Sequence, residues 1–307
     1  MKLIRNIPSL PDFSPRAIAI GAFDGIHQGH LAVINSLVEL KKSENLICAL
    51  MTFEPLPKEV LLSEALPRLT NFRERYGQIK NLNIDEYYCI NFRKVRKINH
   101  VIFLKNILLQ NLSVKYLFVG SDFKFGKDGK GDLDFLKIMS SELDYKVIEV
   151  DTLVDSEKKI SSTHIRNTLI ANDLNLAQQL LGRPYTMSGR VRKGQQLGRT
   201  LGYPTANIAV KRLKCALEGV YLVRANLEGI TYNGIASIGT RPTLGGFPVE
   251  LEVYLLDFCD DIYGKYLDVE FLDYISPQIK YDNLDQLIVK MNADEKKARA
   301  LITRHGL

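Results

Sequence analysis

The sequence predicts an α/β domain followed by an all-β domain. The prediction rests on two different patterns of apolar residues along the chain. As far as about residue 180, short apolar runs alternate with longer segments of helical periodicity, which is typical of a parallel sheet covered by helices. From Gly182 onwards, closely spaced glycines separate short alternating segments, which indicates an antiparallel barrel or sandwich. The length of 307 residues also suits two domains. We expect the boundary at Leu181–Pro184, between domains 1–181 and 182–307.

Strands of the N-terminal domain are expected where short apolar, partly β-branched runs stand between longer helical segments. Apolar stripes predict a first helix around Leu31, Ile34, Leu37 and Val38, and a later one around Ile102, Ile107 and Leu108. The expected strands are Ala17–Ile20, Leu46–Phe53, Glu86–Ile90, Val114–Gly120 and Lys146–Val150. Their order in the sheet does not follow from this pattern.

Strands of the C-terminal domain are expected in shorter, alternating segments. The chain then returns to helical spacing from Leu284 to Arg304, with Asn283 placed to cap this last helix. The expected strands are Met187–Val191, Val220–Ala225, Ile230–Ile238, Leu251–Phe258 and Tyr266–Phe271.

Composition excludes several classes of protein. With 46% hydrophobic and 25% charged residues, the chain is an ordinary globular protein. A net charge of +6 suits polyanionic ligands such as nucleotides. The basic residues are scattered and Trp is absent, so we expect no nucleic-acid interface. Neither a membrane span nor a signal peptide is expected, because no apolar stretch is long enough. We therefore expect a cytoplasmic location.

The four cysteines predict neither disulfides nor a zinc site. Cys48, Cys89, Cys215 and Cys259 have no CxxC spacing and stand among apolar residues. We expect them to be buried, reduced thiols.

A glycine-rich loop joins the first expected strand to the first expected helix and reads GAFDGIHQGH. Glycines let the backbone approach a ligand closely, and amides at a helix start carry partial positive charge, so the loop can hold a phosphate. Two histidines of the loop, His27 and His30, could stabilise the charge that develops as pyrophosphate leaves. The expected phosphate contacts are Gly21, Phe23, Asp24, Gly25, His27, Gly29 and His30.

Two other interpretations of this loop stay open, because it matches neither GxxxxGK[ST] nor GxGxxG. It could be a glycine-rich turn with incidental histidines, or a partial zinc site. A second segment, Ile160–Arg166, favours phosphate chemistry. Its Ser162 and Thr163 hydroxyls stand at an expected helix start, and Arg166 supplies a guanidinium suited to pyrophosphate. Without that role, the segment would be a plain helix cap with a solvated arginine.

The C-terminal domain carries a second glycine-rich stretch, Gly189–Asn207, in which basic residues stand among the glycines. Its backbone amides, among them those of Gly194 and Gly202, could wrap nucleotide phosphates. Thr205 and Asn207 offer the hard oxygen donors that Mg²⁺ prefers. The alternative is a glycine-rich hairpin with surface arginines.

Two glutamates are candidates for the base that a kinase needs to deprotonate the accepting hydroxyl. Glu250 and Glu252 lie two residues apart on one expected strand, so both side chains should point to the same face. Either one could instead be an ordinary solvent-facing residue of the strand.

Together these motifs resemble a known family. The HxGH loop with the distal ISSTHIR segment resembles the nucleotidyltransferase superfamily, and FDGIHQGH is similar to the adenylyltransferase module of bacterial bifunctional riboflavin kinase/FAD synthetases. The resemblance continues through TFEP at Thr52–Pro55 and GSDFKFG at Gly120–Gly126. In the C-terminal half, GRTLGYPTAN is similar to the riboflavin kinase signature, and Ser237–Thr243 and Asp261–Gly264 fit the same module.

The resemblance implies a Rossmann-like nucleotidyltransferase domain followed by a riboflavin kinase-like barrel with a terminal helix. It implies that ATP is held by His27, His30, Ser162, Thr163 and Arg166. Asp122 would lie at the flavin and nucleotide site. In the barrel, Thr205 and Asn207 would hold magnesium and nucleotide, and Glu252 would be the catalytic base.

Four residues depart from the family pattern. Leu56 stands where the family often has histidine after TFEP, so a contact from that side chain is missing. Ser276 and Gln278 stand where the family commonly has arginine and glutamate, and Tyr254 replaces a frequent histidine. We expect altered kinase affinity or rate, and not loss of activity.

The activity that the resemblance implies has two steps. The barrel would phosphorylate riboflavin with magnesium ATP, and the N-terminal domain would adenylylate the FMN to FAD and release pyrophosphate. One alternative is a nucleotidyltransferase that acts on another phosphate ester, with a C-terminal domain that only binds or regulates. A non-enzymatic nucleic-acid-binding protein is the third possibility, motivated by the positive charge alone.

Overall fold

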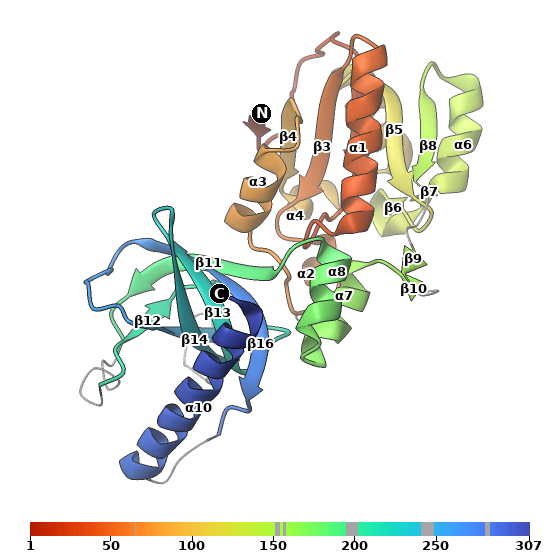
Figure 1. Cartoon of the computed structure of the whole chain (residues 1–307). Helices are drawn as coiled ribbons and strands as arrows, with labels where there is room; N and C mark the ends of the chain where they lie inside the picture. The colour runs from red at the N-terminus through yellow and green to blue at the C-terminus, as the bar shows by residue number, and fades with distance from the viewer. Residues whose placement is uncertain (65, 151–153, 156–157, 195–201, 241–248, 280–282) are drawn as a thin grey trace. The chain divides into compact units, whose positions relative to one another are not determined.

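The computed structural model describes residues 1–64, 66–150, 154–155, 158–194, 202–240, 249–279 and 283–307 (Figure 1). Its contacts divide the chain into two compact units, neither of which is one continuous segment. The first unit comprises Met1–Leu66 and Arg75–Ser161, and the second comprises Pro67–Glu74 and Ser162–Leu307. An eight-residue piece of the N-terminal half therefore belongs to the same unit as the C-terminal half.

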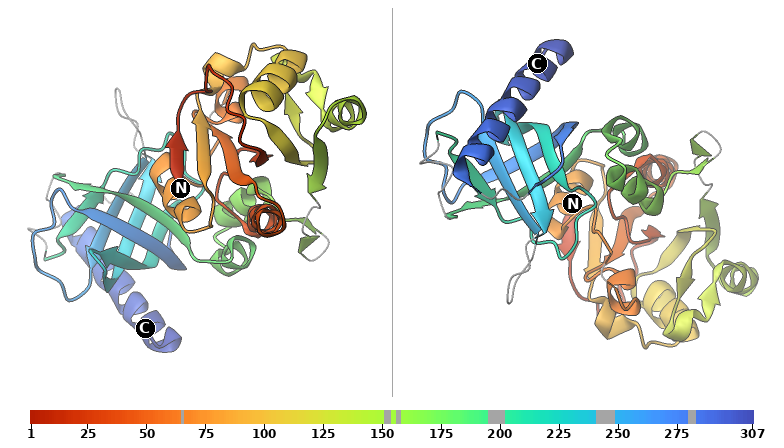
Figure 2. Two further views of the ribbon diagram at one scale, coloured as in Figure 1. Left: turned by 90° about the horizontal axis from the view of Figure 1, so that it is seen from above. Right: turned by 90° about the horizontal axis from the view of Figure 1, so that it is seen from below.

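The first unit is built on a six-stranded parallel sheet with helices on both faces (Figures 1 and 2). Its strand order is β1-β4-β3-β2-β5-β8, and it changes direction between β2 and β5. Ligands of open parallel sheets bind at such a point, beyond the carboxyl ends of the strands. The strands are β1 (Lys2–Ile4), β2 (Arg16–Ile20), β3 (Ile47–Phe53), β4 (Glu86–Ile90), β5 (Val114–Gly120) and β8 (Lys146–Val150).

The helices of this unit bury apolar stripes against the sheet. A core cluster packs Leu104 and Leu108 of η1 and Leu136 of α6 against sheet residues such as Ile18 and Met51. The helices are α1 (Gln28–Ser43), α2 (Pro57–Leu61), α3 (Phe72–Lys80), α4 (Phe92–Val95), α5 (His100–Ile102), the π-helix η1 (Phe103–Asn111), the short 3₁₀ helix η2 (Lys127–Gly129) and α6 (Leu133–Glu142). Two small hairpins complete the unit: β6 (Lys124–Phe125) with β7 (Gly131–Asp132), and β9 (Val154–Asp155) with β10 (Lys158–Lys159).

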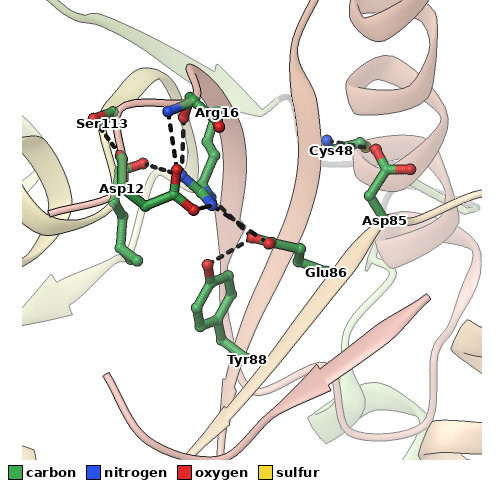
Figure 3. A network of polar contacts seen from close by, with 9 residues as sticks. Asp12, Arg16, Cys48, Asp85, Glu86, Tyr88 and Ser113 are labelled. Carbon is green, nitrogen blue, oxygen red and sulfur yellow. Dashed lines mark hydrogen bonds and ion pairs between the residues drawn. The ribbon is translucent and has the colours of Figure 1, made fainter. Parts of the chain in front are cut away.

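A polar network closes the amino-terminal edge of this sheet (Figure 3). The fully buried Arg16, at the start of β2, donates from Nε to Glu86 at 2.8 Å and from Nη2 to Asp12 at 2.5 Å. Its Nη1 donates to the carbonyls of Ser14 and Leu112. Burial alone would lower the pKa of Arg16, but these two carboxylates raise it, so the guanidinium stays charged.

The second unit is a closed antiparallel barrel with helices packed on it (Figure 1). The strand order around the barrel is β11-β12-β15-β14-β13-β16. Alternate residues of each strand fill the interior, as in β15, where every second residue from Val249 to Leu255 is buried. The elements are α7 (Ser162–Ile170), α8 (Leu174–Leu181), β11 (Tyr185–Arg192), β12 (Thr205–Ile208), β13 (Gly219–Leu227), β14 (Ile230–Thr240), β15 (Val249–Leu255), β16 (Tyr266–Ser276) and α10 (Leu284–His305).

The segment Pro67–Glu74 is fixed to the barrel by a buried ion pair. Arg212 donates from Nη2 to Glu74 at 2.6 Å, and both side chains are almost completely buried. The same carboxylate accepts the backbone amide of Ser188 on β11 at 2.7 Å. Arg212 also donates to the carbonyls of Arg68 and Leu69. The barrel therefore contains an essential contact from a distant part of the sequence.

The α/β and barrel folds are confirmed, and every expected strand exists within a few residues of its expected ends. The capping of α10 by Asn283 is also confirmed, since its side chain accepts the amide of Gln286. One expectation on the cysteines is wrong: Cys48 and Cys89 are buried, but Cys215 is half-buried and Cys259 is exposed. Cys259 follows the end of β15 and has no core to enter.

Candidate functional site

The HxGH loop begins at the carboxyl end of β2, beside the change of direction in the sheet. His27 is the N-cap of α1, and its Nδ1 accepts the backbone amide of His30 at 3.2 Å. The Nδ1 of His30 in turn accepts the amide of His27 at 3.4 Å. Because both Nδ1 atoms act as acceptors, each neutral imidazole carries its proton on Nε2 and can donate from there. The two rings stack with centroids 3.6 Å apart, so the two donors are held side by side.

The backbone of this loop requires its glycines. Gly25 has φ of +93°, in the region that favours glycine, and the neighbouring Phe23 and Ile26 also have positive φ. A Cβ on Gly29 would lie 3.2 Å from the His27 ring and 3.5 Å from the carbonyl of Ile160. The loop is therefore a strained, tightly packed turn, as expected for a ligand-binding loop. The helix α1 starts at Gln28, earlier than the sequence suggested, so Gly29 and His30 belong to its first turn.

A fully buried arginine lies close to this loop, and the sequence motifs did not predict it. Arg75 of α3 donates from Nη2 to Glu54 of TFEP at 2.8 Å and from Nε to the hydroxyl of Tyr87 at 3.1 Å. Thr52 donates to the same hydroxyl at 2.9 Å. Burial raises the pKa of Tyr87, which keeps the hydroxyl neutral. In sequence Arg75 is one charge among several in RERYGQIK, and nothing there marks it.

Asp122 and Leu56, the two other residues expected near the flavin, differ in exposure. Asp122 follows the carboxyl end of β5, is largely exposed, and lies 4.0 Å from the Nζ of Lys159. Leu56 is buried and is the N-cap of α2. The position that departs from the family pattern is therefore filled by an apolar side chain in the core.

The second phosphate segment lies in the second unit, at the start of α7. Ser162 is half-buried and Thr163 is exposed in the first turn of the helix. Arg166 is buried rather than solvated, and its Nε donates to the carbonyl of Pro67 at 2.6 Å. This contact orients the guanidinium from one side. The division between the two units falls between Ser161 and Ser162, inside the motif.

The barrel brings the expected kinase residues together on its outer face. Asn207 of β12 pairs directly with Glu252 of β15. The Thr205 hydroxyl donates to the Glu252 carboxylate at 3.5 Å, a long hydrogen bond. The half-buried positions of β15 include both Glu250 and Glu252, which confirms that the two share a face. A carboxylate, a hydroxyl and an amide oxygen therefore meet on one patch of the sheet.

Both glycines expected at the kinase nucleotide site have geometry that other residues would disturb. A Cβ on Gly194 would lie 2.4 Å from the amide nitrogen of Asn207, so the loop passes directly over that side chain. Gly202 has φ of +84°. Between them, Gln195–Leu201 of the glycine-rich stretch lies outside the described residues, as do Arg241–Thr243 of the second kinase segment.

Two of the departures from the family pattern, Tyr254 and Ser276, have close partners in the structure. The ring of Tyr254 packs edge-on against Tyr203, whose hydroxyl donates to Asn292 of α10 at 2.5 Å. The hydroxyl of Ser276 donates to Asp294 of α10. Lys290 of the same helix donates to both Ser276 and Asp294. A lysine of α10 therefore places a cation beside Ser276, the position at which the resemblance implied an arginine.

The amide of Gln278 lies against the same outer face as Glu252. Its Nε2 donates weakly to the Ser237 hydroxyl at 3.4 Å. Ser237 is the partner of Glu252 on the other neighbouring strand, β14. The amide keeps the hydrogen-bonding reach of a glutamate at this position but removes its charge.

The donors around Glu252 fit a magnesium ion that is bound together with nucleotide phosphates. Thr205 and Asn207 offer a hydroxyl and an amide oxygen, which are hard donors, on the strand next to Glu252. Within the described ranges, no cluster of three or more His, Cys, Asp or Glu side chains could hold a metal ion. A magnesium ion would thus depend on phosphate oxygens for its remaining ligands, as is usual for this metal.

Comparisons with known proteins agree with both halves of this description. A family model described as FAD synthetase matches residues 10–164, and one described as riboflavin kinase matches residues 181–302. The bifunctional riboflavin kinase/FMN adenylyltransferase of Escherichia coli K12 is 37% identical over 304 residues, which cover 97% of each chain. The Pseudomonas fluorescens protein of the same name is also 37% identical, with 98% of each chain covered.

A solved structure shares the fold of nearly the whole chain. It is titled as a macrolide-efflux protein from Streptococcus pneumoniae, with a TM-score of 0.80 and 31% identity, and it covers 97% of this chain. Among the described helices of the present chain, none combines the length and apolarity needed to cross a membrane. Two family models in sequence order and curated relatives that match end to end show that the chain belongs to the bifunctional riboflavin kinase/FMN adenylyltransferase family.

Proposed function

We propose that the chain phosphorylates riboflavin to FMN on its barrel and adenylylates FMN to FAD at the HxGH loop. The observation that carries the proposal is the meeting of Thr205, Asn207 and Glu252 on one outer face of the barrel. A C-terminal domain that only binds or regulates would not need this carboxylate beside two oxygen donors. We assign the adenylyltransferase to residues 1–181 and the kinase to 182–307, which the family matches at 10–164 and 181–302 support.

In the kinase step, Glu252 acts as the general base. It accepts the proton of the ribityl hydroxyl while the hydroxyl oxygen attacks the γ-phosphorus of ATP and the bond to the ADP oxygen breaks. Thr205 and Asn207 would hold magnesium, which when bound neutralises charge on the nucleotide phosphates. The backbone of Gly194 lies directly over Asn207 and would close that side of the nucleotide site.

In the adenylylation step, an oxygen of the FMN phosphate attacks the α-phosphorus of ATP, and pyrophosphate leaves as the α–β bridge breaks. The Nε2 protons of His27 and His30 would donate to phosphate oxygens as negative charge grows on them. Ser162, Thr163 and Arg166 would bind the leaving pyrophosphate. Asp122 would contact the flavin or nucleotide from the end of β5.

The proposal is tested with the full chain, riboflavin, ATP and magnesium, followed by separation of the flavins. We expect both FMN and FAD. Glu252→Gln should stop FMN formation from riboflavin while supplied FMN is still adenylylated, and His27→Ala should do the reverse. If Glu252→Gln leaves kinase turnover unchanged, the base lies elsewhere, with Glu250 the next candidate. Omission of magnesium should stop FMN formation. The cytoplasmic location stays a prediction.

A further inference from the structure

Arg75 is a buried cation at the end of the sheet where the HxGH loop lies. It is fully buried. Two of its neighbours follow the carboxyl ends of strands, Glu54 after β3 and Asp24 after β2. The third, Tyr87, reaches toward the same end from β4. Burial opposes the charge on Arg75, yet Tyr87, Glu54 and Asp24 raise its pKa, so it stays protonated. The side chain touches no solvent and cannot contact a substrate directly.

The two carboxylates near Arg75 pose an electrostatic problem for the site. Asp24 is buried inside the phosphate-binding loop, and Glu54 is mostly buried one strand away. Substrates of adenylylation carry several negative charges each, and like charges in a poorly solvated site repel strongly. A cation that is paired with Glu54 and also acts on Asp24 removes much of this repulsion without competing for the phosphates.

Another buried arginine of the same unit, Arg16, provides a reference. All three nitrogens of its guanidinium donate to protein acceptors. By contrast, the Nη1 of Arg75 is buried and has no hydrogen-bond partner among the described residues. Leaving a buried donor unsatisfied costs about 1–3 kcal/mol, and Arg212 of the barrel leaves its Nη1 unsatisfied in the same way.

We propose that Arg75 is a positioning residue of the adenylylation site, which holds the Glu54 carboxylate in place and offsets the negative charge of Glu54 and Asp24 beside the phosphate-binding loop. Arg75 acts through these carboxylates and favours the approach of ATP and FMN. The inference rests on the proposed adenylylation of FMN by this loop.

The test measures KM and kcat for FAD formation from FMN and ATP with the full chain. Arg75→Met keeps the volume but removes the charge, and we expect it to raise KM for ATP about tenfold or more, the effect of one uncompensated charge at intermediate dielectric. We expect kcat to fall less. Arg75→Lys should restore most of the loss, because a lysine still supplies the charge. Circular dichroism and urea unfolding of each variant report how much of the first unit, which holds Arg75, is folded.

Two further variants separate charge balance from packing. Glu54→Gln added to Arg75→Met removes a carboxylate along with its cation, and should bring KM back toward the wild-type value. Arg16→Met, a buried arginine at the opposite edge, should leave KM for ATP unchanged in the folded fraction. The inference is overturned if Arg75→Met leaves KM unchanged, if Arg75→Lys is as impaired as Arg75→Met, or if the second substitution gives no rescue.

One remaining outcome identifies a different role. If Glu54→Gln alone abolishes adenylylation, Glu54 acts on the reactants itself, and charge balance by Arg75 is not the explanation. A wild-type chain that forms no FAD would instead contradict the proposed function before any variant is compared.

Discussion

Two fully buried arginines, Arg16 and Arg75, lie at opposite edges of one parallel sheet and differ in how the protein completes their hydrogen bonds. At the amino-terminal edge, Arg16 has two carboxylates and two carbonyls around it. At the carboxyl-terminal edge, Arg75 has one carboxylate and a hydroxyl, and one buried nitrogen is left over. The same residue type therefore closes the fold at one edge and adjusts a charged site at the other.

The difference shows where a sheet of this kind can accept incomplete interactions. Loops at the amino-terminal edge have no ligand to bind, so their polar groups are satisfied within the protein. Loops at the carboxyl-terminal edge must meet a ligand, and there the chain also has positive φ at Phe23 and Ile26. Positive φ is not confined to that edge, since Ser113, directly before β5 at the amino-terminal edge, also has it.

The largest expected difference between the two arginines is in the free energy of unfolding when each is replaced by methionine. Arg16→Met leaves Glu86 buried without its cation, and we expect a loss of about 3–5 kcal/mol in the free energy of unfolding of the first unit. Arg75→Met should cost less, about 1–3 kcal/mol, because Glu54 is 29% exposed and can turn to water. Urea unfolding followed by circular dichroism measures both. An equal or larger loss for Arg75→Met would remove the distinction.

A smaller effect concerns replacement by lysine. The guanidinium of Arg16 donates in three directions, which an ammonium cannot reproduce, so Arg16→Lys should lose about 1–3 kcal/mol. Arg75→Lys should lose under about 1 kcal/mol, because only one carboxylate needs the charge. The two variants can be compared by urea unfolding under identical conditions. Equal losses would show that both sites depend on guanidinium geometry.

The smallest effect is a dependence on pH at the Arg16 edge. Hydrogen bonds from Arg16 and Ser14 lower the pKa of Asp12 from 3.8 to about 2. Because the folded pKa is the lower one, the stabilisation is complete above pH 3.8 and is lost as pH falls through 2. Asp12 is 45% exposed, so after screening by solvent we expect less than about 1 kcal/mol.

Asp12→Asn tests this effect directly. The variant should be slightly less stable than the wild type at pH 6, and the difference should shrink as the pH approaches 2. Asp144→Asn is the comparison: a hydrogen bond from Lys115 lowers the pKa of Asp144 as well, but on the exposed surface, where screening by solvent should leave a smaller difference. A difference between wild type and Asp12→Asn that does not change with pH would assign the contribution of Asp12 to something other than its charge.

Much of the fold followed from apolar patterning, and the exceptions have physical causes. The buried strand β4 was expected with its observed ends, because all five of its residues are buried and stand between polar segments. The short edge strand β1 was missed, since three residues give no periodicity. The strand β12 was missed because its first three residues, Thr205–Asn207, end the glycine-rich stretch and show no apolar alternation of their own. The helix around Ile107 is a π-helix, which an apolar stripe cannot distinguish from an α-helix.

The candidate site could be predicted where its residues stand together in one short motif. It could not be predicted where its residues come together only through tertiary contacts. His27 and His30 cap one helix turn, so their spacing already carried the geometry. The partners of Arg75 come from three separate segments, and no local sequence pattern predicts that they lie close together. Likewise, the cation beside Ser276 is Lys290 of another element, α10, so the sequence around Ser276 does not indicate it.

The placement of Pro67–Glu74 in the second unit affects how the gene of such a protein can be divided by recombination. A gene that fuses two consecutive modules can lose or exchange either one by a single cut. In this chain, any cut between residues 161 and 181 separates Arg212 from Glu74, its buried partner. A recombinant that kept only the barrel would have to replace that carboxylate or the arginine at the same time. Separating the barrel from the N-terminal half of the chain would therefore leave the buried guanidinium of Arg212 without its carboxylate.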